Sequence, residues 1–202
     1  MQDEILIIPT LGSHLADEVL NYAFSSTPDT HLESTTGDAF HPLSKARIEQ
    51  ALDDVELNHS RDREDDIYSV FEGEGLLGKM ICWYVIEGED NDSLRILATV
   101  TLSVPQEKWG HALLVANAYN EQSTVGKAFL RIKEDESHAQ LYFESVADLS
   151  AGVTDSTLQR FIMLSLYAAH VFFEKTRMEK LLVPTRSKKP RQAHKTREVT
   201  HA

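Results

Sequence analysis

The sequence has one cysteine, no long hydrophobic run and no recognisable secretory signal. Cys82 cannot form an internal disulfide, and its place in the apolar run MICWYVI predicts a buried thiol rather than a reactive one. No apolar run approaches the roughly 18 residues of a membrane span. The start, MQDEILIIPTL, lacks the basic region that opens a secretory signal. These absences predict a cytoplasmic protein without a membrane segment.

Motifs for phosphate binding, nucleophilic catalysis and metal binding are also missing. No GxSxG, GxxxxGK[ST] or GxGxxG occurs, and the segment EGEGLLG has acids where a phosphate loop needs a lysine. The nine histidines form no HxxxH or HExxH pair, and there is no CxxC. The acidic clusters at 62–66 and 87–92 lack the spacing of a calcium loop. We therefore expect no enzymatic activity, no cofactor and no metal site.

Charge is distributed unevenly along the chain, whose formal net charge is −12. From Val183 onward there are six basic residues and one acid, a balance of +5; the remainder has 14 basic and 31 acidic residues, a balance of −17. An acidic body repels nucleic acid and anionic membranes. Residues 183–202 are basic and nearly without apolar residues, which predicts a disordered tail. Nucleic acid would bind only through the basic residues between 186 and 197.

The stretch from Leu141 to Glu174 carries the strongest structural signal. It predicts a strand, a turn at Gly152, and a helix from about Asp155 to Met178 capped by Thr154 or Asp155. The apolar residues of this helix fall on two faces, with Leu158, Phe161, Ile162, Ser165, Ala169 and Phe172 on one and Leu164, Tyr167, Ala168 and Val171 on the other. A helix that is apolar nearly all round must be buried on more than one side. We expect the sheet to cover one side, and either an N-terminal helix or a second copy of the chain to cover the other.

The rest of the main domain, residues 41–182, reads as strands and helices with short connections. We expect a helix starting at Pro42 or Ser44, strands at 66–72, 79–86, 94–104, 127–133 and 139–146, and a helix opened by Pro105 with Trp109, Ala112, Leu113, Ala116 and Tyr119 or Asn120 inward. The continuous apolar run at 79–86 predicts burial on both faces. Strands joined by short turns pair antiparallel, and helices then cover one face. The predicted fold is α+β, with an antiparallel sheet of about five strands in the order α-β-β-β-α-β-β-α.

Residues 1–40 are expected to be an appendage made of a short helix and a linker. An apolar run covers residues 5–8, and a helix is predicted from Ser13 to about Phe24. Its apolar face consists of Leu15, Val19, Leu20, Ala23 and Phe24. Residues 25–40 are rich in Ser, Thr and Asp, which is typical of a flexible linker.

Several segments of the main domain match a known pattern. They are SKARIEQALDDVEL, DREDDIYSVFEG, LLVANAYNEQS, GKAFLRIKED, LYFESVADLSAGVTDSTLQRF and VFFEK. Together they resemble the YbjN family of bacterial proteins, also called sensory transduction regulators, over roughly residues 41–182. The sequence departs from that pattern at Tyr119, where Trp is frequent, and in lacking a proline before the strand at 127.

The resemblance implies the fold of type III secretion chaperones, a curved antiparallel sheet with packed helices that is often dimeric. It implies no enzymatic activity, and instead a regulatory or chaperone-like role in binding an unknown protein partner, with a homodimer as one possibility. The candidate binding residues are Met163, Leu166, Tyr167, His170 and Phe173 on the last helix, with Asn117 and Asn120.

Other interpretations stay open at this point. The two asparagines can instead satisfy backbone groups at the helix end and the next loop. A small-ligand sensor or an uncharacterised enzyme would need a pocket between the sheet and the helices, around Glu144, His170 or the asparagines. A weaker alternative is a nucleic-acid-associated regulator that acts through the basic tail.

Overall fold

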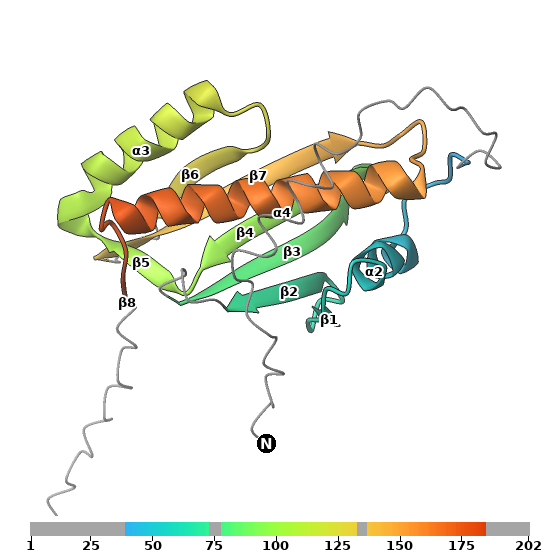
Figure 1. Cartoon of the computed structure of the whole chain (residues 1–202), viewed down its shortest axis with the longest axis horizontal. Coiled ribbons are helices and arrows are strands. Elements are labelled where there is room, and N and C mark those ends of the chain that lie inside the picture. Colours follow the sequence, from blue (N-terminus) through green and yellow to red (C-terminus); the bar gives the residue numbers. More distant parts are fainter. Residues whose placement is uncertain (1–38, 73–77, 133–136, 185–202) are drawn as a thin grey trace, which may run out of the picture.

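A computed structural model of the chain describes residues 39–72, 78–132 and 137–184. These residues form an antiparallel sheet with helices packed on one face, and the long helix α4 runs along the sheet (Figure 1). The elements in chain order are α2 Lys45–Asp53, β1 Ser60–Arg61, β2 Ile67–Glu72, β3 Lys79–Glu87, β4 Ser93–Val100, β5 Leu102–Pro105, η1 Gln106–Lys108, α3 Trp109–Gln122, β6 Lys127–Ile132, β7 His138–Asp148, α4 Asp155–Met178 and β8 Val183–Pro184.

The sheet confirms the predicted α+β class but has more strands than expected. Strands β1, β2, β3, β4 and β7 are consecutive neighbours, and β6 pairs with the other edge of β7. Strand β5 pairs with β7 and with β8. The prediction of about five strands in the order α-β-β-β-α-β-β-α is therefore wrong in count and order, because the described residues contain eight strands. Val183 and Pro184, predicted to begin the basic tail, form β8.

The predicted strand at 94–104 is interrupted at Thr101, and the cause lies on neighbouring strands. Gln140 on β7 donates from Nε2 to the carbonyl oxygens of Val100 and Leu102, the latter at 2.8 Å. The Lys79 N–H donates to Thr101 Oγ1 at 3.0 Å. Side chains thus replace part of the regular ladder, and the strand divides into β4 and β5.

Both helix starts that the sequence predicted from capping residues are confirmed. Ser44 caps α2 by accepting a bond from the Arg47 N–H, and Thr154 caps α4 by accepting one from the Thr157 N–H. Helix α4 spans Asp155–Met178, the predicted range. Each cap satisfies an N–H that the first helical turn would otherwise leave unpaired.

Helices α2 and α3 flank α4, but its second apolar side stays half-buried or exposed, with Val171 41% exposed. Helix α2 contacts α4 and buries Ile48 and Leu52. From α3, the Tyr119 ring lies 5.2 Å from the Phe172 ring and 6.0 Å from the Phe143 ring, centroid to centroid. These contacts lie on the first side and the flanks of α4, so the expectation that the N-terminal helix or a second copy covers the second side stays a prediction.

Helix α3 differs from the expectation at its start and on its inner face. Pro105 ends β5 and precedes the short 3-10 turn η1, so α3 begins at Trp109 rather than at Pro105. The buried residues of α3 are Ala112, Val115 and Ala116. Leu113 therefore lies on the solvent side of α3 and is 45% exposed, so the prediction that it points inward is wrong.

The start of the described chain is tied to the end of the sheet. His41 and Val153 form an antiparallel bridge, with backbone N–H to O distances of 3.2 and 2.9 Å. The Arg47 guanidinium donates to the carbonyl oxygens of His41, Pro42 and Val153 at 2.8, 3.0 and 2.7 Å. It also pairs with Asp155 at 2.5 Å. These contacts fix the point at which residues 1–38 join the domain.

Candidate binding surface

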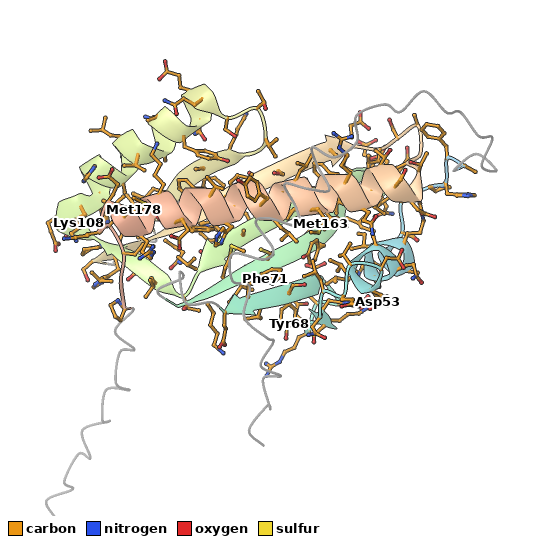
Figure 2. The ribbon with its side chains drawn as sticks, viewed as in Figure 1. Asp53, Tyr68, Phe71, Lys108, Met163 and Met178 are labelled. Carbon is orange, nitrogen blue, oxygen red and sulfur yellow. The ribbon has the colours of Figure 1, made fainter. Side chains whose placement is uncertain are left out.

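The two faces of the sheet differ in what covers them. Successive side chains of a strand point to opposite faces. One face packs under the helices and includes the buried residues Phe71, Tyr84, Ile96, Leu141 and Phe143. The helices in the described ranges do not cover the opposite face. Figure 2 labels Phe71 and Tyr68, which lie on β2 and belong to the covered and the uncovered face respectively.

The uncovered face carries large apolar and aromatic side chains in two adjacent rows. The strand register places Tyr68 beside Trp83 and Leu97, and Val70 beside Ile81 in the next row. Tyr142 and Phe129 continue that second row on β7 and β6, and their rings stack with centroids 5.5 Å apart and planes 12° apart. We call the following half-buried set the open sheet face: Tyr68, Val70, Ile81, Trp83, Leu97, Phe129 and Tyr142.

Charged residues border the open sheet face. Arg95 lies between two acids, with its Nη2 2.5 Å from Glu87 Oε2 and its Nε 3.1 Å from Glu144 Oε1. On the β6 side, Lys127 and Arg131 are exposed and alternate with Phe129, so all three point to this face. An apolar aromatic centre with a charged rim is the usual composition of a protein-binding surface.

Three of the predicted binding residues on α4 lie in the core. Met163, Leu166 and Phe173 are each at most 8% exposed, and Figure 2 shows Met163 on α4, with the exposed Met178 at its far end. Tyr167 and His170 are half-buried. Burial lowers the pKa of His170, and the nearby Glu174 carboxylate partly opposes that shift.

The two asparagines of α3 have different environments. Asn117 is exposed. The Asn120 side chain accepts a bond from the Ala128 N–H at 2.7 Å and donates to the Ala128 carbonyl at 2.9 Å. The Asn120 amide therefore bonds to the N–H and the carbonyl of Ala128 that point away from β7, as a neighbouring strand would at the edge strand β6. This contact matches the structural interpretation, in which the asparagine satisfies backbone groups beyond the helix.

The described residues offer little of what a catalytic or metal site needs. No group of three or more His, Cys, Asp or Glu side chains in the described ranges is placed to hold a metal ion. A hollow of about 340 Å³ lies at the end of the sheet, not between sheet and helices, and is lined by residues 40–43, 90–92 and 149–152. No helix in the same ranges is long and apolar enough to cross a membrane. Burial raises the pKa of the Cys82 thiol, so it stays protonated.

Fold and surface together define a small α+β protein whose described helices leave one sheet face uncovered. The chain belongs to the YbjN family, described as "putative bacterial sensory transduction regulator", which matches residues 44–177. A solved structure with the same fold is that of YbjN from E. coli, described as "a putative transcription regulator". It superposes with a TM-score of 0.61 at 16% identity, covering 73% of this chain and 100% of that one. No curated protein matches the chain significantly.

Sequence reasoning missed the open sheet face, although one signal pointed toward it. The apolar run at 79–86 predicted burial on both faces of that strand. In the structure β3 alternates instead, with Met80, Cys82 and Tyr84 buried and Ile81 and Trp83 half-buried. That prediction is wrong for the described residues, because they supply a helical layer on one face only. The ion pair between Glu144 and Arg95 was also missed.

Proposed function

We propose that this protein is a non-enzymatic, chaperone-like regulator that binds another protein through the open sheet face. The observation that carries the proposal is the set of seven apolar and aromatic side chains on a sheet face that the described helices leave uncovered. Its place of action would be the cytoplasm, which suits a chain whose lone cysteine is buried and reduced.

The composition of this surface favours protein binding over small-ligand binding. Tyr, Trp and Arg dominate the energy of protein interfaces, and the open sheet face has Tyr68, Trp83 and Tyr142 with Arg95 at its rim. The side chains stand on a hydrogen-bonded sheet, so little ordering entropy is lost when a partner binds. A small ligand would instead need an enclosed pocket with converging polar groups.

The partner expected here presents an apolar segment with charged flanks. The apolar rows of the face would contact its hydrophobic residues, and the charged groups at the rim would set its orientation. A second copy of this chain could meet the same description, and a homodimer would then be one form of the interaction.

The test introduces charge into the centre of the open sheet face. In the double variant Trp83→Lys and Leu97→Lys, both substitutions lie on half-buried positions that point away from the core. Tagged full-length protein is used to recover partners from cells, and the amounts are compared by mass spectrometry. We expect the variant to lose the partners that the natural chain recovers.

The matched control is Leu113→Lys with Leu114→Lys, which adds the same charge to exposed leucines on α3. This control should keep the partners. Circular dichroism and urea unfolding establish that both variants fold. If the sheet-face variant folds and recovers the same partners as the natural chain, the proposal is wrong.

A further inference from the structure

We infer that the N-terminal segment, residues 1–24 of the same chain, docks on the open sheet face and competes there with the partner. This inference rests on the proposed function, because it takes the same surface as the binding site. It adds that a segment of the same chain occupies that surface when no partner is bound.

The segment is apolar enough to need a surface. Residues 5–8 are Ile-Leu-Ile-Ile, and a helix at 13–24 would present Leu15, Val19, Leu20, Ala23 and Phe24 on one side. These residues lie outside the family match at 44–177, so the shared fold does not include them. A helix this short is marginally stable alone and needs tertiary packing of its apolar side.

The attachment point lies at the end of the sheet. The bridge between His41 and Val153, with the bonds from Arg47, holds the start of the described chain there. Phe40 shares the nearby hollow with residues 90–92, the turn between β3 and β4. The attachment point therefore lies beside the turn that joins β3 and β4, two strands that carry the open sheet face.

The linker has the length that the distance requires. Residues 25–38 would span an r.m.s. distance of about 20 Å as a flexible chain. Along β4, Leu97 lies four residues from Ser93 at this end of the sheet, or about 13 Å. A linker that matches its span gives effective concentrations in the millimolar range.

The open sheet face also suits the segment in size. A helix at 13–24 would be about 18 Å long. Strands β2, β3, β4, β7 and β6 together are about 19 Å wide, at about 4.8 Å between neighbours. The second apolar side of α4 is the smaller alternative, because it offers only Leu164, Tyr167, Ala168 and Val171 between α2 and α3.

Charge favours the β6 side of this face. Residues 1–38 contain seven acids and no lysine or arginine. Most of the domain is acidic and would repel such a segment. Lys127 and Arg131 are exposed on the β6 side of the open sheet face and can pair with Asp17, which flanks the apolar side of the proposed helix.

The first experiment measures how accessible Trp83 is to acrylamide. In a Trp109→Phe background Trp83 is the only tryptophan. Adding Val19→Asp and Leu20→Asp to the full-length chain should release the segment and raise the quenching constant of Trp83 at least about twofold, since the tether otherwise keeps the face mostly occupied. The control His14→Asp with Asn21→Asp adds the same charge on the opposite side of the helix and should leave quenching unchanged. Equal quenching in all three proteins would overturn the inference.

The second experiment locates the segment by cross-linking with a bis-maleimide. One protein combines Ala23→Cys with Ile81→Cys on the open sheet face, and the other combines Ala23→Cys with Ala168→Cys on α4. Cys82 is fully buried and should not react. We expect an intramolecular cross-link for the sheet pair only. Cross-linking to α4 would overturn the inference, and so would covalent dimers, which would indicate a second copy on this face.

Partner binding separates this inference from the proposed function. The Val19→Asp and Leu20→Asp variant should recover more partner than the natural chain, because the internal competitor is removed. If Trp83 is not protected in the natural chain while Trp83→Lys with Leu97→Lys still abolishes partner recovery, the proposed function stands and only the internal occupant is wrong.

Discussion

The two faces of one sheet use similar residue types with different results. The covered face places Phe71, Tyr84 and Phe143 under the helices, where each is at most 2% exposed. On the open sheet face, Trp83 and Tyr142 lie on the strands that also carry Tyr84 and Phe143, and both are half-buried. Burying an apolar side chain contributes about 1.5–3 kcal/mol. On the covered face, folding has already buried the side chains. On the open sheet face, part of the free energy of burial can still be gained when another surface binds there.

Because neighbouring residues of one strand point to opposite faces, one of them is expected to affect folding stability and the next to affect binding. A side chain on the covered face is surrounded by the helices, so its removal leaves a cavity. A side chain on the open face has strand neighbours but no helix from the described residues above it, so its removal should affect binding more than folding. Each of the following predictions tests this comparison or the contacts that maintain it.

The largest effect is expected from neighbouring residues of β7 that point to opposite faces. Phe143→Ala should lower the free energy of unfolding by about 3–5 kcal/mol, because it empties a fully buried site in contact with the Tyr119 ring. Tyr142→Ala should cost less than about 1.5 kcal/mol, chiefly its stacking on Phe129. Urea unfolding followed by circular dichroism measures both. Similar losses would show that the open face is as tightly packed as the covered one.

Gly126→Ala should be the next most destabilising change, by about 2–4 kcal/mol from strain and overpacking together. Gly126 has φ of +69°, and a Cβ there would lie 2.6 Å from Ser145 Oγ and 2.7 Å from the Glu144 carbonyl oxygen. Gly110→Ala is the control, because no atom lies within 4 Å of its added Cβ. Thermal unfolding should show a lower Tm for the first variant and no loss for the second.

Asn120→Ala should cost about 1–3 kcal/mol, because it removes both bonds to Ala128 at the edge of the sheet. Asn117→Ala, three residues away and exposed, should change stability by less than about 0.5 kcal/mol. Amide hydrogen exchange gives the specific readout, since the Ala128 N–H should exchange faster in the Asn120 variant alone. Unchanged exchange at Ala128 would contradict the role given to Asn120.

The smallest effect concerns pH. Burial lowers the pKa of His170 below its ordinary 6.5, so the unfolded chain binds a proton more readily than the folded one. The contribution of neutral His170 to the free energy of unfolding is fully present above pH 6.5 and decreases as the pH falls below 6.5. His170→Gln should therefore flatten the loss of stability between pH 7.5 and 5.5, measured by urea unfolding. An unchanged slope would assign the pH dependence to other groups.

Local signals made α4 predictable, and long-range contacts made the strand break unpredictable. Helix α4 has a capping Thr154 and no Gly or Pro until Pro184, so both ends could be placed from the sequence. The break at Thr101 depends on Gln140, some 40 residues further along the chain. No local pattern contains that contact.

The candidate site was less predictable than the fold, for a related reason. Apolar residues on several sides of α4 suggested a surface helix face, but Met163, Leu166 and Phe173 are buried in the core. The alternation of β3 could have indicated an apolar outer face. Which side the helices cover, however, depends on packing that the period of one strand does not reveal.

The amide of Asn120 also limits how copies of this domain can assemble. Unpaired edge strands allow sheets to join edge to edge into open-ended fibres. At Ala128 the outward N–H and carbonyl of β6 are already bonded to Asn120, so an incoming strand would first have to displace it. An array that grows through β6 would therefore have to break these two bonds at every junction.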